Sequence, residues 1–306
     1  MVGRGRRAPV SPLAQRAGVD PVRLRLPEDP GGRWATVRDH LVERYGAGRA
    51  EALLGSGGLV SYDGVASGDE VYAAGRVYWF HRELAPEEPV PFGIGVVYRD
   101  ERILVADKPH FLATTPRGGH ITETLQARLR RELDLPELQP AHRLDRLTAG
   151  LVLCVVRAGD RGAYQTLFRD RAVFKEYVGV AAHDPGVELP RTVRSRIVKE
   201  RGVLAAREVA GEPNSESRVE LVEHRAGLGR YRLLPVTGRT HQLRVHMNSL
   251  GLPLLGDPLY PVVRAAGTED WSRPLGLLAG VLAFTDPLTG EAFRFESRLP
   301  PGQWPR

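Results

Sequence analysis

The sequence predicts an α+β fold, in which strands and helices do not alternate as regular units. Short runs of β-branched and aromatic residues follow one another too closely for repeated βαβ units, which need connections of about a dozen residues or more. A hairpin is predicted at 96–109, where two such runs flank the polar residues 99–102. Separate amphipathic patterns with capping residues predict isolated helices between the strands.

The N-terminal part of the chain is expected to contain a tail and a small domain. Residues 1–27 combine several prolines with many arginines and the single acid Asp20, a composition that cannot bury enough apolar surface to become ordered. Residues 28–90 are expected to form the small domain. It begins with a capping-box pattern at Thr36 and Asp39, followed by apolar residues at helical spacing. A second helix and two strands are predicted at 49–54, 59–64 and 70–79.

The remaining residues, 91–306, are expected to form one large domain after the proline-broken linker 85–91. Thr122 is predicted to cap a helix whose apolar residues recur every four positions up to Leu133. Asp160 is predicted to cap another helix. Further strands are predicted at 151–156, 173–180, 217–222 and 229–235, and a last helix ends near Gly251. The polar stretch 191–223 is weakly patterned, and we assign no chemistry to it.

Composition favours a nucleic-acid partner and gives no support to several other classes. The chain has 306 residues and a net charge of +6, which comes mostly from arginine, the side chain suited to phosphate contact and base stacking. It has no glycine-rich phosphate loop and no metal-ligand spacing, so we expect neither a cofactor nor a metal. The single Cys154 and the absence of a long apolar segment agree with a cytoplasmic protein without a membrane span.

The stretch from His142 to Gly150 carries the most informative chemistry. Asp145 lies between Arg143 and Arg146, and these opposite charges favour its ionised form. An apolar run follows at once and is expected to form a buried strand that fixes the carboxylate in position. Asp145 is therefore a candidate nucleophile or charge stabiliser, although an isolated pattern of this kind is more often a surface ion pair.

Four ordered stretches together resemble the RluA-type pseudouridine synthases, whose aspartate attacks a uridine in RNA. They are 97–116, 142–150, 175–177 and 238–246. The resemblance covers about 90–300 and implies a mixed, mostly antiparallel central sheet flanked by helices and loops, with the site in a basic cleft. It implies that Asp145 is the nucleophile, that Tyr177 packs on the target base and assists proton removal, and that Arg244 pairs with Asp145. Without the resemblance, Tyr177 would be interpreted as a core residue and Arg244 as a phosphate contact.

The resemblance also implies contacts with RNA and a reaction without a cofactor. Arg143 is expected to fill the space left by a flipped base. The RNA-binding residues expected from the motifs are His142, Arg143, Arg146, Thr148, Arg239, His241 and Gln242. Attack on C1′, attack on C6 and removal of a ribose proton all remain open for Asp145. Two helices followed by a small β element also resemble, loosely, an S4-type RNA-binding domain at 28–90.

Two functional hypotheses follow from these residues. The first is an isomerase that converts uridines of structured RNA to pseudouridine, in a tRNA anticodon stem-loop, an rRNA hairpin or both. The second is a non-catalytic RNA-binding or folding factor on the same scaffold, for which Asp145 would be superfluous. Relatives of this architecture are commonly monomers, and we expect a monomer here.

Overall fold

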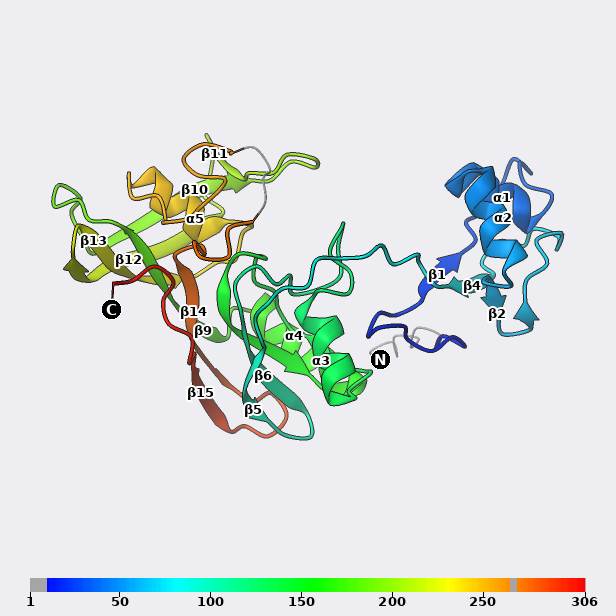
Figure 1. Ribbon diagram of the computed structural model, residues 1–306, viewed down its shortest axis with the longest axis horizontal. Coiled ribbons are helices and arrows are strands. Elements are labelled where there is room, and N and C mark those ends of the chain that lie inside the picture. Colours follow the sequence, from blue (N-terminus) through cyan, green and yellow to red (C-terminus); the bar gives the residue numbers. More distant parts are fainter. Residues whose placement is uncertain (1–9, 265–268, 306) are drawn as a thin grey trace. The chain divides into compact units, whose positions relative to one another are not determined.

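The computed structural model describes residues 10–264 and 269–305, which divide into two compact units (Figure 1). The first unit ends at Pro86 and the second begins at Glu87. We expected the boundary a few residues later, after a linker. Glu87 instead belongs to the second unit, because its carboxylate accepts hydrogen bonds from the backbone N–H groups of Ile121, Thr122 and Glu123.

The first unit is a four-stranded antiparallel sheet packed against two helices. The helices are α1 (Val37–Tyr45) and α2 (Ala47–Gly55), and the sheet order is β1-β4-β2-β3. Its strands are β1 (Val22–Arg25), β2 (Val60–Ser61), β3 (Gly64–Val65) and β4 (Val77–Phe80). The capping box of Thr36 and Asp39 is present as predicted. The strand predicted at 70–79 is shorter than expected.

The expected unstructured tail 1–27 must be corrected. Its residues 1–9 lie outside the described residues, but β1 falls inside the range and pairs antiparallel with β4. Leu24 and Leu26 are buried in the core that also contains Leu41, Leu53 and Tyr78. The arginines that made this stretch look unable to fold alternate with these leucines, so β1 presents an apolar face to the core.

The second unit is built around an eleven-stranded sheet, counted over the described residues. Its main order is β11-β10-β12-β13-β9-β14-β8-β6-β5, with β15 on β14 and β7 on β8. The first strands along the chain are β5 (Gly95–Arg99), β6 (Ile103–Lys108), β7 (Gln139–Pro140), β8 (Ala149–Val155) and β9 (Val173–Ala182). The later ones are β10 (Arg191–Val198), β11 (Arg207–Val209), β12 (Ser215–Arg225), β13 (Leu228–Pro235), β14 (Leu277–Thr285) and β15 (Ala292–Glu296). Only the pairing of β8 with β14 is parallel, so the predicted α+β fold with a mixed, mostly antiparallel sheet is confirmed.

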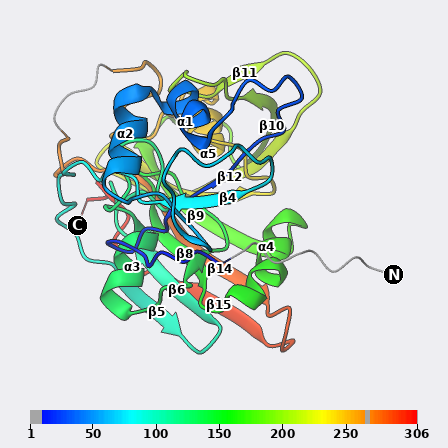
Figure 2. The same cartoon turned by 90° about the vertical axis from the view of Figure 1, so that its right-hand side faces the viewer.

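Helices cover both faces of this sheet at the neighbouring strands β6 and β8. Alternate residues of β8 point to opposite faces, so Val152 and Cys154 pack under α3 (Leu125–Leu133) while Leu151 and Leu153 pack under α4 (Arg161–Arg169). Figure 2 shows β6, β8, β14 and β15 side by side between these two helices. Such two-sided burial fixes the strand that follows the Asp145 loop.

Two helix starts differ in detail from the prediction. The N-cap of α3 is Thr124, whose hydroxyl accepts a hydrogen bond from Ala127 N at 3.1 Å. Thr122 is not the cap, because its hydroxyl donates to the Glu87 carboxylate. Asp160 stands at the N-cap position of α4 but makes no side-chain capping bond. A short 3-10 turn (Ala158–Asp160) leads into that helix instead.

The stretch 191–223, to which the sequence assigned no chemistry, forms most of a β ribbon at one end of the sheet. β10 pairs with β12, and β12 pairs with β13. The helix α5 (Gln242–Ser249) packs against this ribbon through Leu243 and Met247. No described helix has the length and hydropathy of a membrane span.

Candidate active site

Asp145 lies in the loop between β7 and β8, and side chains of residues 108–114 hold this loop through hydrogen bonds. The Thr114 hydroxyl donates to Leu144 O at 2.8 Å and accepts from Leu144 N at 3.1 Å. Thr148 N donates to Asp145 O at 3.1 Å and closes the turn. The backbone on both sides of the carboxylate is therefore fixed, while its side chain stays 28% exposed.

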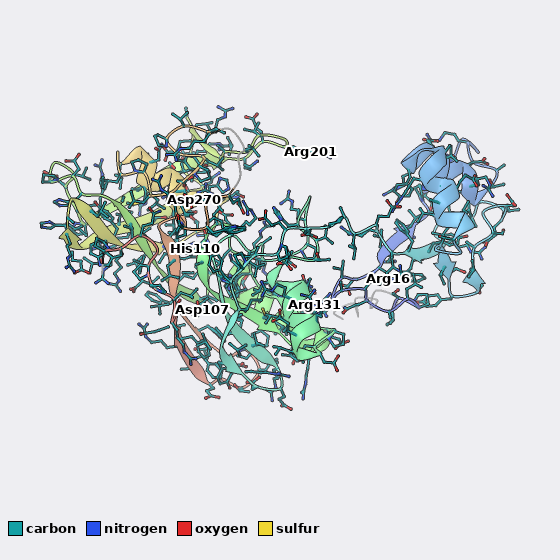
Figure 3. The ribbon with its side chains drawn as sticks, viewed as in Figure 1. Arg16, Asp107, His110, Arg131, Arg201 and Asp270 are labelled. Carbon is teal, nitrogen blue, oxygen red and sulfur yellow. The ribbon has the colours of Figure 1, made fainter. Side chains whose placement is uncertain are left out.

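Two further side chains from the same segment bind carbonyls of the loop. Lys108 Nζ donates to the carbonyl oxygens of Pro109, Leu112 and Arg146 at 2.9, 2.7 and 3.2 Å. His110, labelled in Figure 3 together with Asp107, places Nδ1 2.7 Å from Leu147 O. Burial lowers the pKa of Lys108 to about 7 and that of His110 to about 4. A neutral His110 that donates from Nδ1 fits this geometry.

The strand register brings the Asp145 loop next to Tyr177. Ala279 of β14 pairs with Gly150 of β8 on one side and with Tyr177 of β9 on the other. A side chain at Gly150 would collide with the backbone of Ala279, because an added Cβ would lie 2.3 Å from Ala279 O. Glycine also suits the φ of 112° at this position. The glycine that ends the signature thus permits the close approach of the two site strands.

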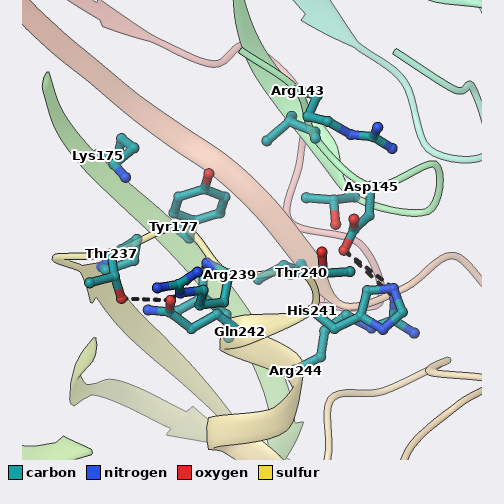
Figure 4. A pocket seen from close by; sticks show the side chains of 16 residues that line it. Arg143, Asp145, Lys175, Tyr177, Thr237, Arg239, Thr240, His241, Gln242 and Arg244 are labelled. Atoms are coloured by element: carbon teal, nitrogen blue, oxygen red, sulfur yellow. Dashed lines mark hydrogen bonds and ion pairs between the residues drawn. The ribbon is translucent and has the colours of Figure 1, made fainter. Parts of the chain in front are cut away.

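Asp145 faces two nitrogen groups of α5 at distances longer than hydrogen bonds. Its Oδ2 lies 3.8 Å from Arg244 Nη1 and 3.9 Å from His241 Nε2. Figure 4 shows these contacts from inside the pocket. The expected proximity of Arg244 is present, but its hydrogen bonds go to Asp257, with Nε to Oδ2 at 2.7 Å and Nη2 to Oδ1 at 2.6 Å.

Tyr260 contacts the side chains of both His241 and Arg244. Its hydroxyl lies 3.0 Å from His241 Nδ1, and its ring lies 5.2 Å from the guanidinium carbon of Arg244. Burial lowers the pKa of His241, although the Asp145 carboxylate acts in the opposite direction. His241 has a φ of 58°, an uncommon conformation for this residue type. The His241 side chain is therefore directed toward the carboxylate from a constrained backbone.

Tyr177 lines the same pocket from β9. Burial and the nearby Asp145 charge raise the pKa of its hydroxyl, so it stays protonated at neutral pH. Within the described residues this hydroxyl makes no hydrogen bond, and the ring packs partly on the cores on both sides of it. An aromatic face and a free hydroxyl donor are thus both available beside Asp145.

The pocket around Asp145 has a volume of about 170 Å³ and is bounded by the Asp145 loop, β9 and the turn before α5 (Figure 4). Among the residues that the structure describes, Asp145 is the only carboxylate that lines it. Arg143 and Arg239 lie at its exposed edge, and Arg143 makes no ion pair or hydrogen bond with the described residues. The pocket can therefore present one anion to a substrate that approaches between cationic groups.

The expected RNA-binding residues differ in how far a substrate could reach them. Arg143 and Arg239 are exposed and lie where a polyanion could reach them, and His241 lines the pocket. Arg146 is half-buried and pairs with Glu269. Thr148 is buried, although it lines the pocket.

His142 and Gln242 are occupied within the protein. His142 stacks on Phe168 at 4.2 Å between ring centroids, and its Nε2 accepts from Leu153 N. Burial lowers its pKa to about 3. The Gln242 Oε1 accepts from Thr237 and from Arg239 N, while its Nε2 donates to Glu216 O and the Ser217 hydroxyl. Both side chains position the backbone of the site.

Several important residues were not identified from the sequence. The sequence assigns no role to Asp257, Tyr260 or Thr114, and it places Lys108 only within the predicted hairpin 96–109. Asp257 offered one signal, because it is an acid within the apolar loop 252–260, where a charge needs a buried partner. Its partner could not be chosen from the sequence.

Comparison with known proteins defines the class to which this fold and site belong. The family described as RNA pseudouridylate synthase matches residues 102–249. A dual-specificity RNA pseudouridine synthase RluA from Escherichia coli K12 is 31% identical over 69% of this chain and 94% of its own length. The RluA of Haemophilus influenzae is 32% identical over 70% of this chain and 95% of its own length.

Solved structures agree with these relatives. The human RNA pseudouridylate synthase domain containing 1 has a TM-score of 0.56 and 27% identity, and covers 70% of this chain and 87% of that one. The class is therefore that of enzymes that isomerise uridine in RNA. Within it, the chain belongs to the RluA-type pseudouridine synthases, and it converts uridine to pseudouridine in RNA.

Proposed function

We propose that Asp145 is the nucleophile of this isomerisation, with Tyr177 and Arg244 as its partners. The observation that carries the proposal is that Asp145 is, among the described residues, the only carboxylate lining the pocket, with the Arg244 guanidinium of α5 and the His241 imidazole at its N-cap within 4 Å. A carboxylate in that setting is a poor proton donor and a usable nucleophile. Its distance from any hydrogen-bond donor leaves its oxygen free to attack.

The reaction needs little more than these groups. The bond from ribose C1′ to N1 of uracil breaks, the detached base turns, and a bond from C1′ to C5 forms as the C5 proton moves to N1. Atoms and electrons balance without water, cofactor or metal. The ring of Tyr177 can support the base during the turn, and its protonated hydroxyl can pass on a proton. Arg244, held by Asp257, positions the carboxylate through charge.

The proposed substrate is a uridine in a loop or bulge of structured RNA, in a tRNA anticodon stem-loop, an rRNA hairpin or both. The relatives are named dual-specificity RNA pseudouridine synthases, which supports the idea of more than one RNA substrate. A looped uridine leaves its stack at lower cost than one in a duplex, because it has fewer neighbours to lose. We propose further that the protein acts in the cytoplasm as a monomer, and that residues 28–90 assist as an S4-type RNA-binding domain.

The decisive test is Asp145→Asn, which keeps the shape of the side chain and removes its charge. Pseudouridine is mapped in tRNA and rRNA from cells that lack the gene and carry either form. We expect at least one site to return with the native protein and none with Asp145→Asn, while purified Asp145→Asn still binds the RNA. Native turnover should be unchanged in excess EDTA and the protein should sediment as a monomer. Turnover by Asp145→Asn would refute the proposal.

A further inference from the structure

A second pocket adjoins the one that contains Asp145. It has a volume of about 440 Å³ and is bounded by the end of α4, the start of β9 and the turn at 236–239. The two pockets share Arg143, Lys175, Tyr177 and the turn residues 237–239 as lining residues. An RNA strand with one nucleotide in the first pocket would therefore have its neighbouring nucleotide at the second pocket.

Five arginine and lysine residues line the second pocket, of which Arg169 pairs with Asp170 and Arg239 donates to Asn214 O. Arg143, Arg171 and Lys175 all line it, and none of them makes an ion pair or hydrogen bond through its side chain with the described residues. In the described part of the chain, no carboxylate lines this pocket. Burial lowers the pKa of Lys175, and the neighbouring Arg171 lowers it further. Lys175 is partly buried, so an anion in the pocket would stabilise its charge, whereas Arg143 and Arg171 are exposed and can reach the same anion.

The backbone at Arg171 gives a second, independent observation. α4 ends in a Schellman motif, in which Arg171 N donates to Phe168 O at 3.4 Å and Ala172 N donates to Leu167 O at 2.8 Å. Arg171 occupies the C′ position of this motif with a φ of 58°, a left-handed conformation that glycine adopts without strain. An exposed arginine is retained at a site where glycine would be more stable. A strained residue of this kind is typical of a functional position.

We propose that this pocket binds a backbone phosphate of the nucleotide next to the target uridine, with Arg171 and Lys175 as its ligands. This inference rests on the proposed function, because the target uridine occupies the pocket of Asp145. Phe168 and Val236 provide an apolar wall for the ribose of that nucleotide. Arginine and lysine are the usual phosphate ligands of proteins, and phosphate contacts set the register of an RNA without reading its sequence.

The test uses Arg171→Gly in the full-length protein, because glycine removes the charge and relieves the backbone strain together. We expect its melting temperature to equal or exceed that of the native protein. We expect KM for a substrate hairpin to rise about tenfold, the scale of one charge-assisted contact, while kcat changes little. The slope of log affinity against log salt should fall by about one. A structural role for Arg171 would instead lower the melting temperature.

Substrates with one neutral methylphosphonate identify the contacted phosphate. A series places it at each linkage near the target uridine. One linkage should cost the native protein about tenfold or more and cost Arg171→Gly less, because only the Lys175 contact remains to be lost in the variant. The matched control is Arg225→Gln, because Arg225 is exposed in the β12–β13 hairpin and lines neither pocket.

Three results would overturn the proposal: an unchanged KM for Arg171→Gly, an equal loss for Arg225→Gln, or losses that add at every linkage. These results are separate from the test of the nucleophile. If Asp145→Asn retained turnover, the proposed catalytic role would fail, while the effect of Arg171→Gly on affinity could still be measured.

Discussion

Arg244 has two carboxylates near it, but it donates hydrogen bonds to only one of them. Asp257 and Arg244 form a bidentate pair with side chains 0% and 2% exposed, whereas Asp145 stays 28% exposed at 3.8 Å. Asp257 thus stabilises the buried guanidinium of Arg244. The positive charge of Arg244 also acts on Asp145, but no hydrogen bond joins the two side chains. This division leaves the carboxylate of Asp145, the proposed nucleophile, without a hydrogen-bond partner among the described residues.

The two carboxylates should therefore differ sharply in their effect on stability. Asp257→Ala leaves a buried guanidinium unpaired, which typically costs about 3–5 kcal/mol in the free energy of unfolding. Asp145→Ala removes a partly exposed charge and should cost less than about 1 kcal/mol. Urea denaturation of both variants measures the difference. Equal losses would mean that Asp145 contributes as much to stability as Asp257, which would contradict the division of roles.

The sequence predicted part of this arrangement. The motifs correctly placed Asp145, Tyr177 and Arg244 at one pocket. They did not identify Asp257 as the hydrogen-bond partner of Arg244, because that contact depends on how a loop thirteen residues further along folds back. His142 and Gln242 were interpreted as RNA contacts for the same reason, since a motif does not show which of its polar side chains face inward.

At the scale of elements, the loop of Asp145 depends on the end of β6. Lys108 is fully buried and directs its ammonium to three carbonyl oxygens, one of them in the loop itself. Three acceptors match the three N–H bonds of a protonated lysine. The hairpin of β5 and β6 was predicted from the sequence, but the function of its last residue was not, because a lysine before a proline looks like an exposed strand end.

Lys108 should make stability depend on pH in a defined window. Its folded pKa of about 7 lies below the ordinary value of 10.5, so the unfolded chain binds more protons between these limits. Stability contributed by this group is therefore present above pH 10.5 and is lost as pH falls through 7. Lys108→Met should lack this contribution to the pH dependence of the free energy of unfolding. It should also lose the hydrogen bond to the loop.

The measurement is the free energy of unfolding in urea for the native protein and Lys108→Met from pH 6 to 10. We expect the difference between them to change in favour of the native protein as pH rises. Turnover of the variant should fall, because the Asp145 loop loses a contact to Arg146 O. A constant difference over this range would show that Lys108 does not titrate there.

At the scale of the whole molecule, each unit has a hydrophobic core of its own. The core of the first unit is built from β1, β4 and the two helices, and four further clusters lie within the second. The sequence predicted the two parts but placed the boundary at 90/91, because it could not show that Glu87 caps backbone groups of the second unit. The pocket of Asp145 is lined only by residues of the second unit.

Residues 87–306 should therefore fold and retain catalysis without the first unit. A protein that starts at Glu87 keeps the carboxylate that binds the backbone of 121–123, and it should unfold in one cooperative transition. Its kcat on a short substrate hairpin should stay within about twofold of the full chain, because every group near Asp145 is retained. Its KM should rise, and its salt dependence should fall, if residues 28–90 contribute phosphate contacts as an RNA-binding domain would. Steady-state kinetics of the two proteins at several salt concentrations separate these effects. An unchanged KM would assign all RNA affinity to the second unit. A lost kcat would show that the first unit completes the site.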